Sequence, residues 1–387
     1  MIKKILLGVT LTIVLLLAAV AIILFSFSAE RPQEDYRVTS LLHNPDFQSS
    51  SKEAENRLKE IYAQYNIPSL SVAVGVNGEP AWSGVIGYAD LNKKIPADTD
   101  TKYRIGSISK PMTATAVMRL NENGLMNIDS PFNEYVTDYA SGNAQYTIKH
   151  LLTHQAGIRH YNNLLLENFS NKEYPTTREA ASVVENDPLL FTPGEGFEYT
   201  TYGYTVLALA MESVASRSFK EIMFDEVFNP IGMTSTTFDK ADPPIDNGIA
   251  MPYLLAEETL FEAPDVNLSY KYAGGGVIST PSDIVKFGNA LLGNEFLNAG
   301  SKEQLWTPVP LNNSEMNPER YALGFRTGQD ELGRFVHHGG LSVGGYSFLI
   351  IYPDIKFVVA ITTNTTPGDR FFDRMEEAKK LVHIFAP

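Results

Sequence analysis

The feature that most constrains this chain is an uncharged apolar run from Ile5 to Phe27 near the N-terminus. At a helical rise of about 1.5 Å per residue, about 23 such residues span about 35 Å, which is enough to cross a bilayer. Signal-peptide cores are usually about 7–15 residues long, and Ser26-Phe27-Ser28 is a weak cleavage site, so we expect an uncleaved anchor. A cleaved signal peptide is the alternative. Lys3 and Lys4 predict a cytoplasmic N-terminus, which makes the chain a single-pass membrane protein with an extracytoplasmic domain.

The stretch that follows the apolar run is polar, contains Ser and Pro, and has no clear hydrophobic period. Such a composition is typical of a linker. We therefore expect three parts in this chain: a transmembrane anchor or signal over residues 1–28, a tether over residues 29–52, and one folded domain over residues 53–387.

The two ends of the folded domain predict a single α+β layer. Apolar residues between Glu53 and Tyr65 have helical spacing, whereas Leu70–Val76, the Asn77-Gly78 turn signal and Ala81–Gly87 predict a β-hairpin. Further strands and a last helix are expected at residues 335–336, 347–352, 357–362 and 369–385. Residues 107–292 have mostly helical patterns broken by Pro and Gly. The expected fold is an antiparallel sheet flanked by the terminal helices, beside a mostly helical region.

Composition excludes several kinds of function. The chain has 387 residues, with 31 Lys and Arg against 45 Asp and Glu, and a formal net charge of -14. A surface this acidic repels phosphate backbones, so nucleic acid is not an expected partner. The cysteine count of 0 excludes thiolate nucleophiles, disulfides and cysteine-ligated metal sites. A catalytic nucleophile in this chain must therefore be oxygen or nitrogen.

The segment Ser107-Ile108-Ser109-Lys110 stands where a polar stretch gives way to a helical pattern. Residues three apart on a helix have Cβ atoms about 5–6 Å apart, so Lys110 can reach the Ser107 hydroxyl and, as a neutral amine, take its proton. Burial and the positive end of the helix dipole both lower the pKa of such a lysine. A helix-capping role is the alternative for Ser107. For a second copy of the pattern, Ser49-Ser50-Ser51-Lys52 in the expected tether, capping and a solvated lysine are the better interpretation.

Six segments resemble, in the expected order, the serine β-lactamase and penicillin-binding-protein superfamily. They resemble its β-lactamase-related esterase and peptidase branch, close to class C β-lactamases, and the mitochondrial serine β-lactamase-like proteins more than the antibiotic-destroying enzymes. The segments are TKYRIGSISKPMTATAVMRLNENGLMNID, IKHLLTHQAGIRHY, FTPGEGFEYTTYGYTVLALAMESV, NPIGMTSTTF, SYKYAGGGVISTPSDIVKFGNALL and HHGGLSVGGYSFLIIYP. The resemblance covers roughly Glu53 to Ala386 and implies the β-lactamase/transpeptidase-like fold.

By this resemblance, Ser107 is the acylated serine and Lys110 is the lysine of the same helix. Tyr199 matches the tyrosine of the second box, Tyr-x-Asn, which relays protons. The third position of that box is Thr201 instead of Asn, so the amide that would bind a substrate carbonyl is missing. Tyr161-Asn162-Asn163 has the letters of the box but precedes its Pro-Gly landmark, and we interpret it as a loop.

The third box, His-x-Gly in this branch and Lys-Thr-Gly in other members, matches His338-Gly339-Gly340. His337 is an adjacent competitor, and only one of the two can face the site because successive strand residues face opposite sides. Arg326-Thr327-Gly328 imitates the other form of the box, but a guanidinium cannot act as a base. The resemblance implies that the backbone N–H groups of Ser107 and Leu341 form the oxyanion hole.

The histidines at 150, 154 and 160 have the spacing of a zinc-protease motif. The position of the general-base glutamate is Leu151, which can neither take a proton nor hold a water, so the metalloprotease mechanism lacks its central group. The resemblance implies that this stretch is a structural helix and turn, and we expect no metal.

These observations predict a membrane-anchored serine hydrolase that acts through an acyl-enzyme on amide or ester bonds of peptide, ester or cell-wall-type small substrates, with no cofactor. The expected catalytic residues are Ser107, Lys110, Tyr199 and His338, and the expected substrate-binding residues are Thr201, Gly340 and Leu341. Two alternatives stay open. A catalytically weak, penicillin-binding-like sensor is suggested by Thr201, and a structural membrane protein is suggested by the anchor.

Overall fold

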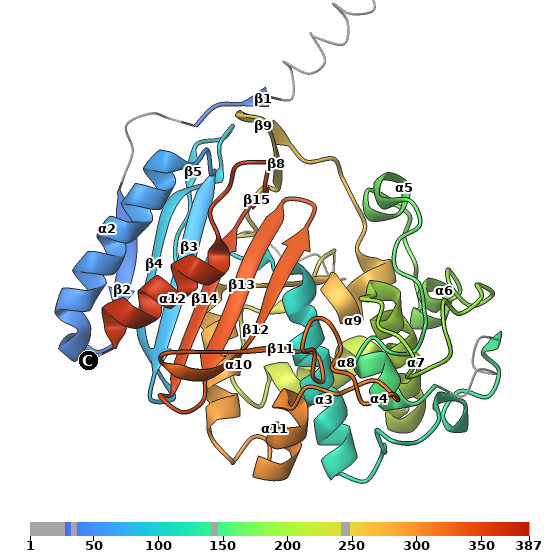
Figure 1. Cartoon of the computed structure of the whole chain (residues 1–387). Helices are drawn as coiled ribbons and strands as arrows, with labels where there is room; N and C mark the ends of the chain where they lie inside the picture. The colour runs from blue at the N-terminus through green and yellow to red at the C-terminus, as the bar shows by residue number, and fades with distance from the viewer. Residues whose placement is uncertain (1–27, 32–36, 141–145, 241–247, 387) are drawn as a thin grey trace, which may run out of the picture.

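The main sheet combines strands from both ends of the chain (Figure 1). The computed structural model describes residues 28–31, 37–140, 146–240 and 248–386. Neighbouring strands of the sheet are antiparallel and follow the order β11-β12-β13-β14-β3-β4-β2, with β5 paired to β4. The strands are β2 (Val38–Leu42), β3 (Ser69–Val76), β4 (Glu79–Asp90), β5 (Ile95–Pro96), β11 (Arg326–Asp330), β12 (Gly333–Ser342), β13 (Gly345–Tyr352) and β14 (Phe357–Thr363).

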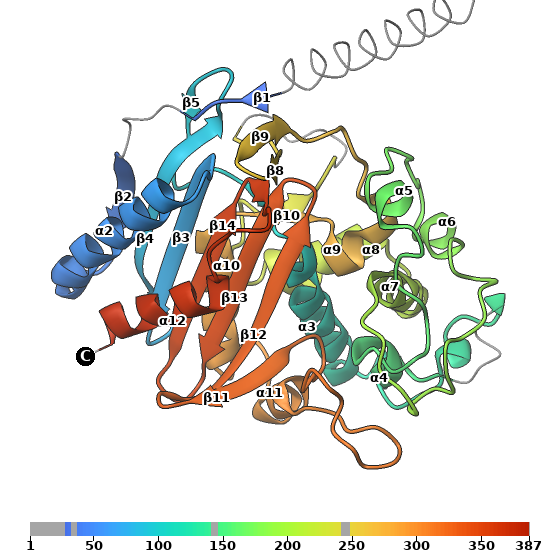
Figure 2. The same cartoon turned by 45° about the horizontal axis from the view of Figure 1, so that its top comes forward.

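Helices cover both faces of this sheet (Figures 1 and 2). In β14, Val359 and Ile361 pack on one face with helices α2 and α12, whereas Val358 and Ala360 pack on the other face with α10 and the helical region. The bounds of these helices are α2 (Gln48–Gln64), α10 (Pro281–Leu292) and α12 (Arg374–Phe385). Because successive strand residues face opposite sides, a strand covered on both faces needs the continuous apolar run that the sequence shows here.

The predicted hairpin is confirmed. β3 and β4 pair directly, and the turn between them contains Asn77 at φ 57° and Gly78 at φ 85°. Two consecutive residues with positive φ are typical of the tight turn whose twist matches that of the strands, and Asn-Gly is the pair that most readily adopts it. The sheet flanked by terminal helices is therefore the α+β arrangement expected from the sequence.

The predicted tether over residues 29–52 is wrong in its described part. Val38–Leu42 is an edge strand of the main sheet, paired with β4, and α2 begins at Gln48. Ser51 and Ala54 lie on the same buried helix face as Leu58, so packing against the sheet extends the helix through residues that predict a linker. The last helix begins later than predicted, because the Asp373 side chain accepts hydrogen bonds from the backbone N–H groups at the start of α12.

The helical region surrounds α3, whose side chains are almost all buried. Its helices are α3 (Ser109–Glu122), α4 (Ile148–Leu152), α5 (Leu164–Asn168), α6 (Thr177–Ala181), α7 (Thr201–Ala215), α8 (Phe219–Met223), α9 (Tyr272–Gly275) and α11 (Ala299–Trp306). Two small sheets join this region to the main one, in the orders β6-β10-β7 and β1-β9-β8-β15. Their strands are β1 (Ser28–Ala29), β6 (Tyr103–Arg104), β7 (Thr237–Phe238), β8 (Tyr253–Ala256), β9 (Thr259–Glu262), β10 (Val277–Ser279) and β15 (Thr365–Thr366).

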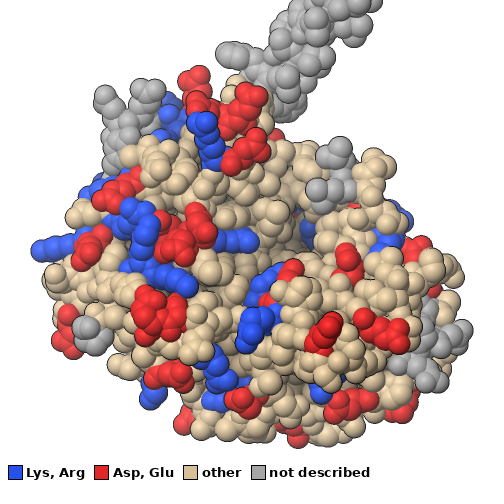
Figure 3. All heavy atoms as spheres, in the orientation of Figure 1, with Lys and Arg blue, Asp and Glu red and all other residues tan. Residues whose placement is uncertain are grey.

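The predicted membrane-spanning run, Ile5 to Phe27, lies outside the described residues. Within the part of the chain that the structure describes, no helix has the length and apolarity needed to cross a bilayer. Acidic and basic side chains are interspersed over the face of the molecule shown in Figure 3.

Candidate active site

Ser107 lies in a single helical turn, Gly106–Ile108, between β6 and α3. Gly106 has φ 50°, a backbone conformation that costs glycine least. The turn is followed at once by α3, whose first turn carries Lys110. The serine and the lysine are thus placed by one short stretch of chain, as their spacing predicts.

Lys110 is completely buried, with an exposed fraction of 0%. Its Nζ lies 3.1 Å from Ser107 Oγ, 3.2 Å from Thr201 Oγ1 and 2.7 Å from the Gly274 carbonyl oxygen. A neutral amine has two N–H groups and one lone pair, so it can donate to Gly274 and Thr201 while its lone pair accepts from the Ser107 hydroxyl. The three contacts are therefore compatible with the deprotonated lysine, in which the lone pair is directed at the Ser107 hydroxyl.

The surroundings of Lys110 favour that neutral form. Burial is the largest cause that holds the pKa of Lys110 well below its ordinary value, and the positive charges of Arg326 and Lys271 act in the same direction. Within the described residues no carboxylate forms an ion pair with Lys110. The site thus places an amine of lowered pKa next to the serine hydroxyl.

Tyr199 lies beside this pair, just before α7. Lys110 Nζ is 4.7 Å from the centroid of its ring, and Tyr199 and Ser107 both line the groove at the nucleophile. Burial raises the pKa of Tyr199 to about 12, although the Arg326 guanidinium acts in the opposite direction. Tyr199 therefore keeps its proton at neutral pH, and can pass a proton between Lys110 and a leaving group without itself being the base.

Thr201 has a different place from the one expected of a substrate-binding residue. It is 4% exposed at the start of α7, and its hydroxyl contacts Lys110. It does not line the groove described below. The threonine thus supports the lysine instead of reaching toward a substrate, and the shorter side chain leaves the contact with the base intact.

Two glycines bring β12 close to the Ser107 turn. A Cβ atom added to Gly340 would lie 2.0 Å from the Ile105 carbonyl oxygen, and one added to Gly106 would lie 2.7 Å from the backbone nitrogen of Leu341. Only residues without side chains allow such an approach. The backbone N–H of Leu341 is therefore brought next to the nucleophile turn, which is the arrangement that an oxyanion hole formed by Ser107 and Leu341 requires.

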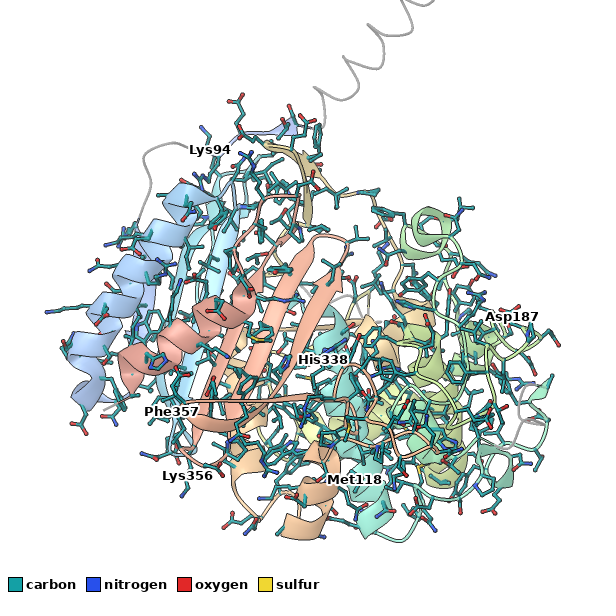
Figure 4. The ribbon with its side chains drawn as sticks, in the orientation of Figure 1. Lys94, Met118, Asp187, His338, Lys356 and Phe357 are labelled. Carbon is teal, nitrogen blue, oxygen red and sulfur yellow. The ribbon has the colours of Figure 1, made fainter. Side chains whose placement is uncertain are left out.

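His338 and His337 lie on opposite faces of β12, as the strand alternation predicts. His338 is fully buried on the face toward the helical region, where Figure 4 shows it close to α3. His337 packs on the other face with Phe335 and Phe348. His338, the histidine predicted for the site, is thus the one that faces Tyr199, at a distance of 6.1 Å between ring centroids.

The hydrogen bonds of His338 indicate a positioning role. Its Nδ1 is 2.7 Å from the Gly339 oxygen, so Nδ1 carries the proton and Nε2 accepts from the Tyr321 hydroxyl at 3.0 Å and from Arg326 Nη1 at 3.2 Å. Burial, followed by the charges of Arg326 and Lys110, holds the pKa of His338 well below its ordinary value. The histidine is neutral and orients Arg326 and Tyr321, with no direct bond to the Tyr199 hydroxyl among its contacts.

Arg326 is a site residue that sequence reasoning missed. In the sequence, Arg326-Thr327-Gly328 is set aside as an imitation of the third box. In the structure, Arg326 stacks over the Tyr199 ring, with 4.9 Å between its Cζ and the ring centroid, and it forms an ion pair with Glu319. The sequence contains a signal for this. If residues 326–330 and 333–337 form a hairpin around the turn before Gly333, Arg326 lies opposite His337 and therefore next to the histidine box. Its charge lowers the pKa values of Lys110 and Tyr199.

Each of the three histidines with zinc-protease spacing accepts a hydrogen bond from a different backbone N–H group. His150 Nδ1 accepts from Thr147, His154 Nδ1 from Thr200, and His160 Nδ1 from Thr201. Within the described residues no three potential ligands gather into a metal site. The competing Tyr161-Asn162-Asn163 segment lies in a loop, where Asn163 caps the following helix.

A groove of about 720 Å³ opens at Ser107. Tyr199, Arg326 and Leu341 line it near the nucleophile. It continues along the outer face of the sheet, where its lining includes the aromatic Tyr346, Phe348, Phe371 and Phe372 and the charged Asp369, Asp373 and Arg374. The volume is in the range of sites that hold a small molecule or a short peptide.

Comparison with known proteins identifies the family of this chain. Residues 54–384 match the family model described as Beta-lactamase. The serine beta-lactamase-like protein LACTB, mitochondrial, of Homo sapiens is 27% identical over 82% of this chain and 74% of its own. Penicillin-binding protein 4* of Bacillus subtilis is 28% identical over 76% of this chain and 67% of its own.

Solved structures show the same fold. The octameric penicillin-binding protein homologue from Pyrococcus abyssi has a TM-score of 0.71 and 25% identity, over 86% of this chain and 76% of that one. D-amino acid amidase from Ochrobactrum anthropi has a TM-score of 0.75 at 21% identity, over 88% of this chain and 98% of that one. Because the family model spans most of the chain, this protein belongs to the beta-lactamase family, within the serine β-lactamase and penicillin-binding-protein superfamily that its motifs resemble.

Proposed function

We propose that this protein is a serine hydrolase that cleaves amide or ester bonds of short peptide-type substrates through an acyl-enzyme. The observation that carries the proposal is the 3.1 Å contact between Ser107 Oγ and the fully buried Nζ of Lys110. A serine hydroxyl needs an adjacent base to become a useful nucleophile, and a lysine can be that base only when it is neutral at working pH.

In this mechanism Ser107 Oγ attacks the substrate carbonyl carbon while its proton moves to Lys110 Nζ. The carbonyl oxygen becomes an oxyanion and accepts hydrogen bonds from the N–H groups of Ser107 and Leu341, each worth about 3–4 kcal/mol of the barrier. The Tyr199 hydroxyl then donates its proton to the leaving nitrogen or oxygen and regains one from the Lys110 ammonium. Water attacks the acyl-enzyme in the reverse sequence of proton transfers and restores Ser107.

The choice of substrate class is supported by the groove and by the relatives. A groove of about 720 Å³ that starts at Ser107 accommodates an extended acyl donor. Among proteins of the same fold are a D-amino acid amidase and a penicillin-binding protein homologue. We further propose a single-pass anchor over residues 5–27, which would keep this domain outside the cytoplasm.

The test is intact-mass analysis after incubation with a fluorophosphonate, a fluorescent penicillin and a D-alanyl peptide. We expect one covalent adduct on the wild-type protein and none on Ser107→Ala. Ser49→Ala is the matched control, since it removes the serine of the second Ser-x-x-Lys segment, which is exposed on α2. Labelling of Ser107→Ala, or a wild-type protein that reacts with none of the probes, would contradict the proposal.

The same probes also distinguish a hydrolase from the alternative function, a sensor. A catalytically weak penicillin-binding-like sensor is favoured by one observation, the Thr201 in place of the family asparagine. Such a sensor would be acylated by the penicillin but would hydrolyse neither the D-alanyl peptide nor its own penicilloyl adduct. Turnover of the peptide by the wild-type protein excludes it.

A substitution of Tyr199 tests the proton relay. We expect Tyr199→Phe to lower kcat/KM for a D-alanyl p-nitroanilide by about 10²-fold, because an amine leaves only when protonated, while the value for a p-nitrophenyl ester falls less than about fivefold. Tyr161→Phe, in the loop with the same motif letters, is the control. Equal losses on anilide and ester would rule out a role for Tyr199 in protonating the leaving group.

A further inference from the structure

Arg374 makes a contact that the mechanism above does not yet use. It is the first residue of α12, and its Nη1 lies 2.6 Å from the Gly340 carbonyl oxygen and 2.9 Å from the Ser347 carbonyl oxygen. Its guanidinium also stacks on Tyr346, 4.2 Å from the ring centroid. The arginine therefore holds β12 and β13 together at the point where β12 passes the nucleophile.

The Gly340 carbonyl belongs to the same peptide group as the Leu341 N–H. A trans peptide group points its C=O and N–H in opposite directions. A cation on the Gly340 oxygen thus lies behind the Leu341 N–H, whose nitrogen lies next to the Ser107 turn. Charge-assisted hydrogen bonds are about twice as strong as neutral ones, and hydrogen bonds in series polarise one another, so the guanidinium makes the Leu341 N–H a stronger donor.

Two local features indicate that this contact has a purpose beyond helix formation. A positive charge in the first turn of a helix is unfavourable for the helix dipole, yet Arg374 occupies that turn. The guanidinium also fits only because residue 339 is a glycine, since a Cβ there would lie 2.2 Å from Arg374 Nη2. A residue that is unfavourable for its own helix, and that fits only because its neighbour is a glycine, is typical of a functional position.

We propose that Arg374 is a positioning residue for the oxyanion hole, which orients and polarises the Gly340–Leu341 peptide group from the outer face of the sheet. The inference rests on the proposed function, because it assigns the Leu341 N–H to the developing oxyanion. Arg374 itself touches neither the nucleophile nor the base.

The experiment measures saturation kinetics of Ser107 labelling by a fluorophosphonate and inhibition of that labelling by phenylboronic acid. Both reagents form tetrahedral adducts at the serine, and both adducts place an oxygen where an oxyanion would lie. We expect Arg374→Met to lower the maximal labelling rate about tenfold with reagent affinity changed less than about twofold, and to raise the boronic acid inhibition constant in parallel. Arg374→Lys keeps the charge and should recover part of both losses.

Arg370→Met is the matched control, since it removes an exposed arginine four positions earlier, outside the groove lining, and should leave both constants unchanged. An unchanged labelling rate in Arg374→Met, or a loss confined to reagent affinity, overturns the inference and leaves the proposed function standing. A wild-type protein that is not labelled overturns both. Where Arg374→Met does not fold, Arg374→Lys decides, with an intermediate rate and a raised boronic acid constant expected.

Discussion

Lys110→Met is expected to lower the rate of Ser107 acylation by about 10³–10⁴-fold at neutral pH, near the upper limit for loss of a general base. Methionine fills similar space but cannot accept the serine proton, and it leaves Thr201 and the Gly274 carbonyl without their partner. The measurement is the second-order rate constant for fluorophosphonate labelling. Lys52→Met is the control, because it changes the exposed lysine of the second Ser-x-x-Lys segment. A loss below about tenfold would mean that another group deprotonates Ser107.

The same lysine predicts the direction of the pH dependence. Since the amine acts only when neutral, the wild-type labelling rate should rise with pH through the lowered pKa of Lys110 and level off above it, well below its ordinary value of 10.5. In Lys110→Met the remaining slow rate should lack this step. A wild-type rate that still rises steeply near pH 10 would show that Lys110 is charged at neutral pH.

The free energy of unfolding should also increase as pH rises, because of the same lysine. Between the folded-state pKa of Lys110 and 10.5, the unfolded chain binds a proton that the folded protein does not. Unfolding then becomes less favourable as pH rises, so the unfolding free energy of the wild type, relative to Lys110→Met, should increase by at most about 1.4 kcal/mol per pH unit within that window. The comparison needs urea unfolding of both proteins at several pH values between 6 and about 10.

The parts of the site that sequence predicts are those fixed by local geometry. Ser107 and Lys110 are one helical turn apart, so their spacing permits the contact that the structure shows. That only one of His337 and His338 faces the site follows from the alternation of strand residues, and the match to the family box selects His338. Likewise, the Asn77-Gly78 turn fixes the register of β3 and β4 without distant information.

The parts that were missed depend on packing between distant segments. Thr201 was expected to contact substrate, and its contact with Lys110 arises only when α7 packs against α3. Arg374 reaches Gly340 across the outer face of the sheet from the last helix. The strand Val38–Leu42 forms because β4 offers it a free edge. Contacts between distant segments do not appear in the hydrophobic pattern of either segment. For this reason the sequence predicts a tether where the structure has a strand and a helix.

The close approach of β12 to the nucleophile leads to the second large expected effect. A Cβ on residue 340 would lie 2.0 Å from the Ile105 carbonyl oxygen and 2.1 Å from Ser347 Oγ. Because the first of these is a backbone atom next to the nucleophile turn, Gly340→Ala has to push the strand away from Ser107. The Leu341 N–H moves with it, and loss of one oxyanion donor costs about 10²–10³-fold in rate.

We therefore expect Gly340→Ala to be acylated about 10²–10³ times more slowly than the wild type, with the pH step of Lys110 retained. Overpacking at this position should also cost about 1–3 kcal/mol of stability, so rates are compared well below both melting temperatures. Gly293→Ala is the control, since the added Cβ meets only the Ala290 oxygen at 3.9 Å. A Gly340→Ala protein that is folded and labelled at nearly the wild-type rate would mean that Leu341 does not stabilise the oxyanion. A loss of the pH step would instead show that the substitution also disturbs Lys110. The slower rate could then no longer be assigned to the Leu341 N–H alone.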